Sequence, residues 1–284
     1  MSVLNTIFQA IIQGLTEFLP ISSSGHLSLF QHFTGKSGEG ALLLSAILHL
    51  GTLVAIFIAF RTTIWELIKE FGTSCKDIVH KQFFKNMNGN RRAIIMLIIS
   101  TLVLVPFYLF KGFFEGFAED SSILAEGICF LYTAAILFLS DRCQKGSKNL
   151  GQITGKDAVT VGFFQSIALL PGVSRSGSTI SSGLFCGMAR ETAVKYSFIL
   201  GIPAVLGGCF VELKDAIETD MSFKADYIIG FFIAAIVGVA AIKMVSWLVK
   251  SDKFKVFAYY TAALGVIVIL IAIIEAIIGK PLSF

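Results

Sequence analysis

The sequence predicts an all-α polytopic membrane protein with six transmembrane helices and two re-entrant helical hairpins, arranged as an inverted-topology repeat. The first observation behind this prediction is composition. Of 284 residues, 55% are hydrophobic and 15% are charged, and the mean hydropathy is +0.79. A soluble core of this size could not bury so much apolar surface. The other two observations are six long apolar stretches and two further apolar stretches that are broken at their centres.

Six apolar stretches are long enough to cross a bilayer, because a spanning helix needs about 20 mostly apolar residues. They are Ala41–Phe60, Ala93–Phe110, Ile123–Leu139, Val194–Val211, Tyr227–Val249 and Val256–Ile278. Glycines near these stretches and the 27 phenylalanines of the chain fit close helix packing and lipid contact. We therefore expect six full crossings.

Two further segments, residues 3–33 and 158–189, are also long enough to span, but LPISSSG interrupts the first and LPGVSRSG the second. Each pattern predicts a helix, a break and a second helix. Such a break leaves backbone groups unpaired, which a membrane tolerates only where the segment is buried in protein or lines a wet cavity. We interpret both segments as re-entrant hairpins. An ordinary span with a kink is the alternative.

Basic residues are distributed unevenly among the loops, and cytoplasmic loops collect Lys and Arg. Residues 61–92 contain seven basic residues, 141–157 contain four and 250–255 contain three. By contrast, acids outnumber bases in 111–122 and 212–226. We expect the first group inside and the second outside. This alternation requires each interrupted segment to enter and leave on one side, the first from outside and the second from the cytoplasm.

A short internal repeat relates the two halves of the chain. SSSGH at Ser22–His26 is similar to SRSGS at Ser174–Ser178, and each copy follows a Leu-Pro pair and precedes three predicted spans. An odd number of crossings inverts the second copy, so the two broken elements are expected tip to tip near the midplane. We predict a single membrane domain built from residues 1–150 and 151–284, with the working site at that junction.

Charged residues lie at both breaks, where an unpaired charge is expensive. Gln13 and Glu17 are four residues apart and share one helix face that leads into the first tip. Arg175 lies in the second tip, where a guanidinium, hydroxyls and a helix N-terminus together favour an anion site, above all for phosphate. The alternative is that Glu17 and Arg175 are counter-ions that hold the tips together. The polar neighbours of the arginine are Ser174, Ser176, Gly177 and Ser178.

His26 follows the first tip and has hydroxyl groups around it in the sequence. A neutral imidazole there could act as nucleophile or proton carrier, although a lone histidine is more often structural. His49, early in the first span, could line the same cavity or serve packing. His32 and His80 receive no role. The hydroxyl groups belong to Ser22, Ser23 and Ser24.

The chemistry of these residues favours hard oxygen ligands over a zinc site. The chain contains neither CxxC nor HExxH, and its five cysteines predict no disulfides. The cofactor we expect is Mg²⁺ or Ca²⁺, bridging Glu17 to a diphosphate. The formal charge of +4 is small for this length, so nucleic acid is not an expected partner.

Two motifs, QGLTEFLPISSSGH at Gln13–His26 and PGVSRSGSTI at Pro171–Ile180, resemble those of the bacterial undecaprenyl-diphosphate phosphatase family, also called bacitracin-resistance proteins. LHLGTLVAIF at Leu48–Phe57 and MARETAVKYSFILGIPA at Met188–Ala204 extend the resemblance over nearly the whole chain. The resemblance implies a metal-dependent phosphatase of the bacterial plasma membrane that converts undecaprenyl diphosphate to the monophosphate and phosphate. Its site would open to the extracytoplasmic side. This reaction would recycle the lipid carrier for cell-wall synthesis and confer bacitracin resistance.

The resemblance also implies roles for residues at both tips. Glu17 would bind the metal or help to activate the attack, Gln13 would be a supporting metal ligand, and Arg175 would hold phosphate oxygens. Either Ser23 or His26 would be the nucleophile, and that choice stays open. The family motif accepts Glu or Gln at its first position, and the glutamine of this chain leaves a single carboxylate for the metal. The groups expected to bind the phosphates are Gln13, Ser22, Ser24, Ser174, Ser176 and Gly177.

Two other functions are alternatives to a phosphatase. Inverted repeats with broken helices are also a transporter architecture, so a lipid-phosphate flippase is the main alternative. A nucleophile beside a phosphate-binding arginine favours chemistry over transport. A purely structural subunit conflicts with charges placed at depth in the membrane. The expected partners are the prenyl diphosphate substrate, membrane lipids and, as an oligomer to be tested, a second copy in a homodimer.

Overall fold

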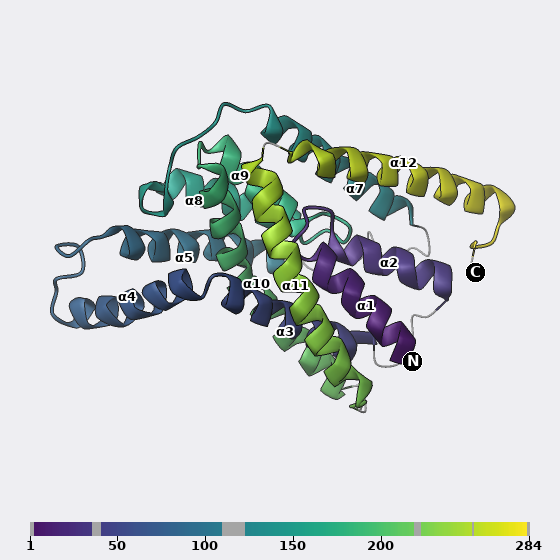
Figure 1. Cartoon of the computed structure of the whole chain (residues 1–284), viewed down its shortest axis with the longest axis horizontal. Helices are drawn as coiled ribbons and strands as arrows, with labels where there is room; N and C mark the ends of the chain where they lie inside the picture. Colours follow the sequence, from purple (N-terminus) through teal and green to yellow (C-terminus); the bar gives the residue numbers. More distant parts are fainter. Residues whose placement is uncertain (1–2, 36–40, 110–122, 219–222, 252, 283–284) are drawn as a thin grey trace.

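The regular structure of this chain is helical, as predicted (Figure 1). The computed structural model describes residues 3–35, 41–109, 123–218, 223–251 and 253–282. Within these ranges there is no strand, and Lys148 and Met188 form one isolated bridge. The helices are α1 (Val3–Thr16), α2 (Ser23–Thr34), α3 (Ala41–Ala59), α4 (Arg61–Val79), α5 (Gly89–Tyr108), α7 (Leu124–Asp141), α8 (Gly155–Ile167), α9 (Arg175–Phe185), α10 (Arg190–Glu218), α11 (Asp226–Lys250) and α12 (Lys255–Ile278), with a short 3₁₀ turn at Leu150–Gln152.

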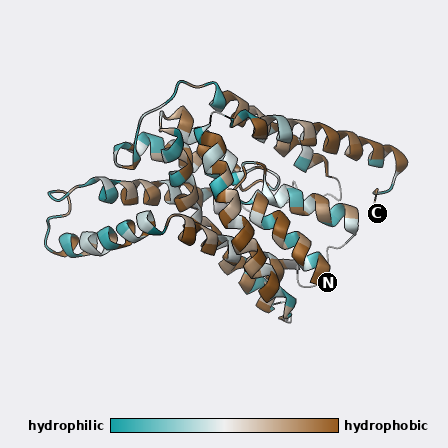
Figure 2. Cartoon of the chain, in the orientation of Figure 1, coloured by the Kyte–Doolittle hydropathy of each residue, from teal (hydrophilic) through white to brown (hydrophobic). Residues whose placement is uncertain are grey.

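Six of these helices, α3, α5, α7, α10, α11 and α12, are long and apolar enough to cross a membrane. The six predicted spans are thereby confirmed, and the chain is a multi-pass membrane protein. Most bounds agree within a few residues, but α10 continues past the predicted end at Val211 to Glu218. The predicted end of the second span, Phe110, lies outside the described residues. Figure 2 shows hydrophobic residues along most of α11 and α12.

Both interrupted segments form two helices separated by a break, as predicted. The first break separates α1 from α2 and contains Pro20, and the second separates α8 from α9 and contains Pro171. Proline lacks an N–H and clashes with the preceding turn, which favours a break at these two places, although α5 and α10 continue through Pro106 and Pro203. Re-entry from one side of the membrane, the inverted repeat and the division at residue 150 stay predictions.

The breaks are brought together because each broken segment packs on a span from the other half of the chain. Helix α1 packs against α11, and α8 packs against α5. Small residues permit this approach: a Cβ at Gly14 would lie 2.9 Å from the carbonyl oxygen of Ala234, and one at Gly162 would lie 2.6 Å from that of Ser100. The remaining spans enclose the breaks, with α3 against α10 and α11, and α7 against α12.

Residues 61–79 were expected in a cytoplasmic loop, and no helix was predicted there; their location on the cytoplasmic side stays a prediction. They form the 19-residue helix α4, which runs back along α5 (Figure 1). Its apolar residues at positions 64, 67, 68 and 71 follow helical spacing, and Ile64 and Leu67 are buried. The helix is too polar overall to be counted as a span, which is why span length alone did not reveal it.

Candidate active site

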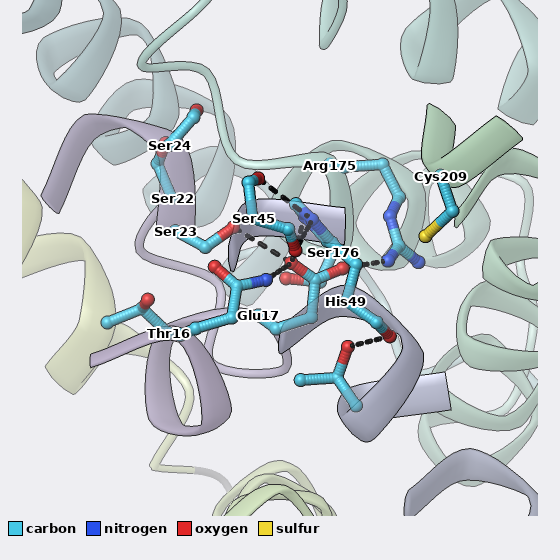
Figure 3. Close-up of polar contacts among 12 residues, drawn as sticks. Thr16, Glu17, Ser22, Ser23, Ser24, Ser45, His49, Arg175, Ser176 and Cys209 are labelled. Atoms are coloured by element: carbon cyan, nitrogen blue, oxygen red, sulfur yellow. Dashed lines mark hydrogen bonds and ion pairs between the residues drawn. The ribbon is translucent and has the colours of Figure 1, made fainter. Parts of the chain in front are cut away.

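The two breaks meet at the carboxylate of Glu17 (Figure 3). Its Oε1 accepts a hydrogen bond from Arg175 Nη2 at 2.5 Å. Its Oε2 accepts from Ser23 Oγ at 2.8 Å and from Gln13 Nε2 at 3.1 Å. The Glu17 side chain is only 8% exposed, so its charge is balanced inside the protein by a guanidinium and by neutral donors. The predicted pairing of Glu17 with Arg175 is therefore confirmed.

Ser22 shapes the first tip. It is the N-cap of α2, and its Oγ accepts from the Gly25 N–H at 3.2 Å. Its φ of 72° lies in the left-handed region that non-glycine residues rarely adopt, and such strain persists where the surrounding structure holds it. The resulting turn directs Ser23, the first residue of α2, toward Glu17, so that its hydroxyl donates a hydrogen bond to the carboxylate.

Ser174 shapes the second tip in the same way. It is the N-cap of α9, and its Oγ accepts from the Gly177 N–H at 3.0 Å. Arg175 is then the first residue of α9, as Ser23 is the first residue of α2. In each tip a serine cap thus presents the following residue to Glu17.

The two tips are also tied to each other by hydrogen bonds. Ser176 Oγ donates to the carbonyl oxygen of Leu19 at 3.2 Å, and the Gly172 N–H donates to Ser24 Oγ at 3.2 Å. Gly172 has a φ of +92°, which a residue with a side chain would adopt only with strain. The predicted serines Ser24 and Ser176 therefore lie at this junction.

Arg175 has one guanidinium nitrogen on Glu17 and one that is buried without a hydrogen-bond partner, Nη1. The guanidinium lies against Gly201 of α10, where any Cβ would collide with it. An unsatisfied buried donor of a charged group is costly, and it is expected to bind an anion. The N-terminus of α9 adds backbone N–H groups, which attract anions as the guanidinium does.

His26 has both ring nitrogens engaged away from Glu17. Its Nδ1 lies 2.7 Å from the carbonyl oxygen of Ser22, and its Nε2 lies 2.8 Å from the hydroxyl of Tyr260 on α12. The two rings are stacked with centroids 5.7 Å apart. The predicted site residue His26 is thus beside the junction, but it contacts the tip backbone and α12.

His49 reaches the junction from α3, so the cavity-lining alternative for this residue is the one that the geometry favours. Its Nε2 lies 3.9 Å from Glu17 Oε2, and its Nδ1 lies 3.6 Å from Glu212 Oε2. Ser45, one turn before it, donates to Glu212 Oε1 at 2.9 Å. The sequence did not point to Glu212 and Ser45, because the two residues are 167 positions apart and no local motif links them.

The predicted metal ligands Gln13 and Glu17 are neighbours on one helix face, as their spacing indicated. Gln13 Nε2 donates to Glu17, and Gln13 Oε1 is buried without a hydrogen-bond partner. In the part of the chain that the structure describes, no group of three His, Cys, Asp or Glu side chains converges as a metal site. A cation here would therefore need oxygen atoms from other sources.

Comparison with known proteins gives one consistent result. The family model for the bacitracin resistance protein BacA matches residues 6–267. The chain is 36% identical to an undecaprenyl-diphosphatase of Alkaliphilus metalliredigens over 280 residues, which covers 96% of this chain and 100% of the relative. It is 38% identical to one of Methanobrevibacter smithii (94% and 97% covered) and 39% identical to one of Carboxydothermus hydrogenoformans (93% and 97% covered).

Proposed function

This chain belongs to the bacitracin resistance protein BacA family, and from that premise we propose that it hydrolyses undecaprenyl diphosphate to undecaprenyl phosphate and inorganic phosphate. One observation supports the chemical mechanism in this proposal. Ser23 donates to one oxygen of Glu17 while Arg175 holds the other oxygen and keeps Nη1 free. A hydroxyl, a carboxylate base and a guanidinium are the nucleophile, the base and the charge stabiliser of phosphoryl transfer.

In the first step, Ser23 Oγ attacks the terminal phosphorus and gives its proton to Glu17. The bond from that phosphorus to the bridging oxygen breaks, and the prenyl monophosphate leaves with the bond's electron pair and takes the proton from Glu17. In the second step, Glu17 accepts a proton from the water that attacks the phosphoserine. It returns that proton to Ser23 Oγ as phosphate leaves, which restores the enzyme.

Arg175 and the start of α9 bind the transferred phosphoryl group in this proposal. The free Nη1 and the backbone N–H groups of the helix terminus supply donors for its oxygens. Ser24, whose side chain is exposed at the junction, adds a hydroxyl. Ser22 and Ser174 act mainly by capping, because their Oγ atoms already accept from backbone N–H groups.

Ser23 is a better candidate nucleophile than His26. Ser23 Oγ donates a hydrogen bond to Glu17 Oε2 at 2.8 Å, and this carboxylate can take its proton. Both nitrogens of His26 already have partners, Ser22 and Tyr260. We therefore assign His26 the role of holding the first tip against α12.

The residues present fit a hard divalent cation such as Mg²⁺ or Ca²⁺. Glu17 and the buried, unpartnered Gln13 Oε1 are oxygen donors on one side of the junction. Mg²⁺ in phosphoryl-transfer sites is commonly held by one or two carboxylates together with substrate phosphates and water, so one carboxylate is sufficient here. When bound, such a cation supplies neutralisation of the diphosphate charge.

The position of the site in the membrane follows from the same charge pattern that orients the spans. We expect the first hairpin to enter from outside, and Glu212 is the first residue of the acid-rich segment 212–226 that is expected outside, so the site should open to the extracytoplasmic side. The prenyl tail stays in lipid while the diphosphate reaches the junction. Transport by an inverted-repeat carrier is not favoured, because the relatives compared above are named as diphosphatases.

The proposal is tested by measuring phosphate release from farnesyl diphosphate by the purified protein in detergent. We expect release by the wild type, a loss of about 10²–10³-fold in Arg175→Ala, Glu17→Gln and Ser23→Ala, and a fall on adding a chelator. Ser251→Ala, at an exposed serine directly after α11, is the control for Ser23→Ala and should keep near wild-type activity. No release from a folded, monodisperse wild type would refute the proposal and favour transport.

A further inference from the structure

We propose that His49 is a second phosphate ligand of this site, oriented by Ser45 and Glu212, and that it holds the phosphate nearer the lipid while Arg175 holds the terminal one. The inference rests on the proposed function and deepens it, because it assigns a residue that distinguishes a diphosphate headgroup from a single phosphate. Nothing in the motifs at the two tips includes this residue.

The ring of His49 has a fixed orientation. Its Nδ1 lies 3.0 Å from the carbonyl oxygen of Ser45, so this nitrogen carries a hydrogen and donates. That leaves Nε2 directed toward Glu17 Oε2 at 3.9 Å, a separation beyond a hydrogen bond. The nitrogen that faces the junction is therefore the one that a ligand can use.

Glu212 holds this arrangement from a different helix. It lies on α10, and its two oxygens contact Ser45 Oγ at 2.9 Å and His49 Nδ1 at 3.6 Å. The charged form of the ring, which donates from both nitrogens, is attracted by the carboxylates on its two sides. A second group that fixes the ring of a functional histidine is a common way of setting its geometry.

Arg175 and His49 approach different oxygens of Glu17, Arg175 at Oε1 and His49 at Oε2. Their side chains are 17% and 25% exposed, whereas that of Glu17 is 8% exposed. The side chains of both donors are thus more exposed than the carboxylate that they approach, although Arg175 Nη1 itself is buried. A diphosphate has two anionic groups for these two donors, and a single phosphate has one.

The test compares two competitive inhibitors of phosphate release from farnesyl diphosphate, methylenediphosphonate and inorganic phosphate. Loss of a charge-assisted hydrogen bond should weaken inhibition by the diphosphonate about tenfold in His49→Gln, with less than about a twofold effect on phosphate. Glu212→Gln should act in the same direction by about threefold, because the ring stays in place but loses one carboxylate.

The matched control is His32→Gln, which also breaks a histidine–glutamate pair, His32 with Glu275 at 2.8 Å, but on the α2–α12 contact. It should change neither inhibition constant. An equal loss for both inhibitors, or no change for either, in an active His49→Gln protein would overturn the inference. Absence of phosphate release by the wild type would instead refute the proposed function, so the two failures are distinguishable.

Discussion

Ser23 and Arg175 hold equivalent positions in the two tips, each directly after a serine N-cap, and yet they have opposite chemistry. One is a hydroxyl and the other a guanidinium, and both bond to the same carboxylate. The internal repeat therefore supplies the geometry twice, while the sequence difference at this one position separates a nucleophile from an anion ligand.

Gly201 should be required for activity because it makes room for Arg175. A Cβ at this position collides with the guanidinium, which must then leave its place beside Glu17. We expect Gly201→Ala to lower kcat/KM about 10²-fold, close to the loss in Arg175→Ala. Gly208→Ala, on the same helix but facing open space, is the control and should stay near wild type. Wild-type activity in Gly201→Ala would contradict the assignment of Arg175.

The pairing of Glu17 with Arg175 could be predicted from the sequence, because each charge at membrane depth needs a partner and the two motifs are similar. The pairing of His26 with Tyr260 could not, since 234 residues separate them and Tyr260 lies in an otherwise apolar span. The contact of Glu212 with His49 could not be predicted either, because the charge count placed Glu212 in a loop outside the membrane. Contacts of this kind depend on how the spans pack.

At the scale of elements, α4 and α5 are joined by a buried arginine. Arg91 is 1% exposed, and its guanidinium donates to Glu70 at 2.8 Å, to Asp77 at 2.7 Å and to the carbonyl oxygen of Phe83. Helix α4 was missed from the sequence because its charged face lowers its mean hydropathy. The apolar positions at helical spacing, beginning with Ile64 and Leu67, were the available signal.

The ion pairs of Arg91 with Glu70 and Asp77 should make the free energy of unfolding depend on pH. Hydrogen bonds from Asn86 and Arg91 lower the pKa of Asp77; at Glu70, burial acts to raise the pKa, but hydrogen bonds from Asn88 and Arg91 outweigh it and lower it. Carboxyls with lowered pKa values stabilise the fold above their ordinary values of 3.8 and 4.5, and this contribution is lost as the pH falls through the lowered values.

We therefore expect Arg91→Ala to lower the melting temperature on the order of 5 °C at pH 7, and by less at pH 3, because part of this contribution is already lost below the ordinary pKa values of the two carboxyls. Thermal unfolding in detergent at both pH values measures this. Arg61→Ala, at an exposed position of the neighbouring helix α4, is the control. An equal effect of Arg91→Ala at both pH values would show that packing, and not the charge pairs, is responsible.

At the scale of the whole molecule, six apolar helices surround two broken segments whose tips meet inside the protein. Composition and segment length were sufficient to predict the spans. Each broken segment packs on a span of the other half, which is compatible with an inverted repeat. The question of which side of the membrane each tip faces is addressed by the charges of the loops and not by the packing of the helices.

That question can be answered by labelling single cysteines in cells with a membrane-impermeant maleimide, after replacement of the five native cysteines. The charge pattern predicts that Ser24→Cys at the first tip reacts from outside, whereas native Cys75, exposed on α4 and restored alone, reacts only after the membrane is opened. Protection of position 24 together with reaction at Cys75 in intact cells would reverse the predicted topology.

If Ser23, activated by Glu17, attacks the diphosphate, a phosphoserine must form during turnover. The most direct measurement is to quench the protein during turnover of farnesyl diphosphate, under both acidic and alkaline conditions, and to map the phosphorylated residue by mass spectrometry. We expect phosphate on Ser23, and none in Ser23→Ala. Phosphate on His26, or turnover by Ser23→Ala at the wild-type rate, would contradict it.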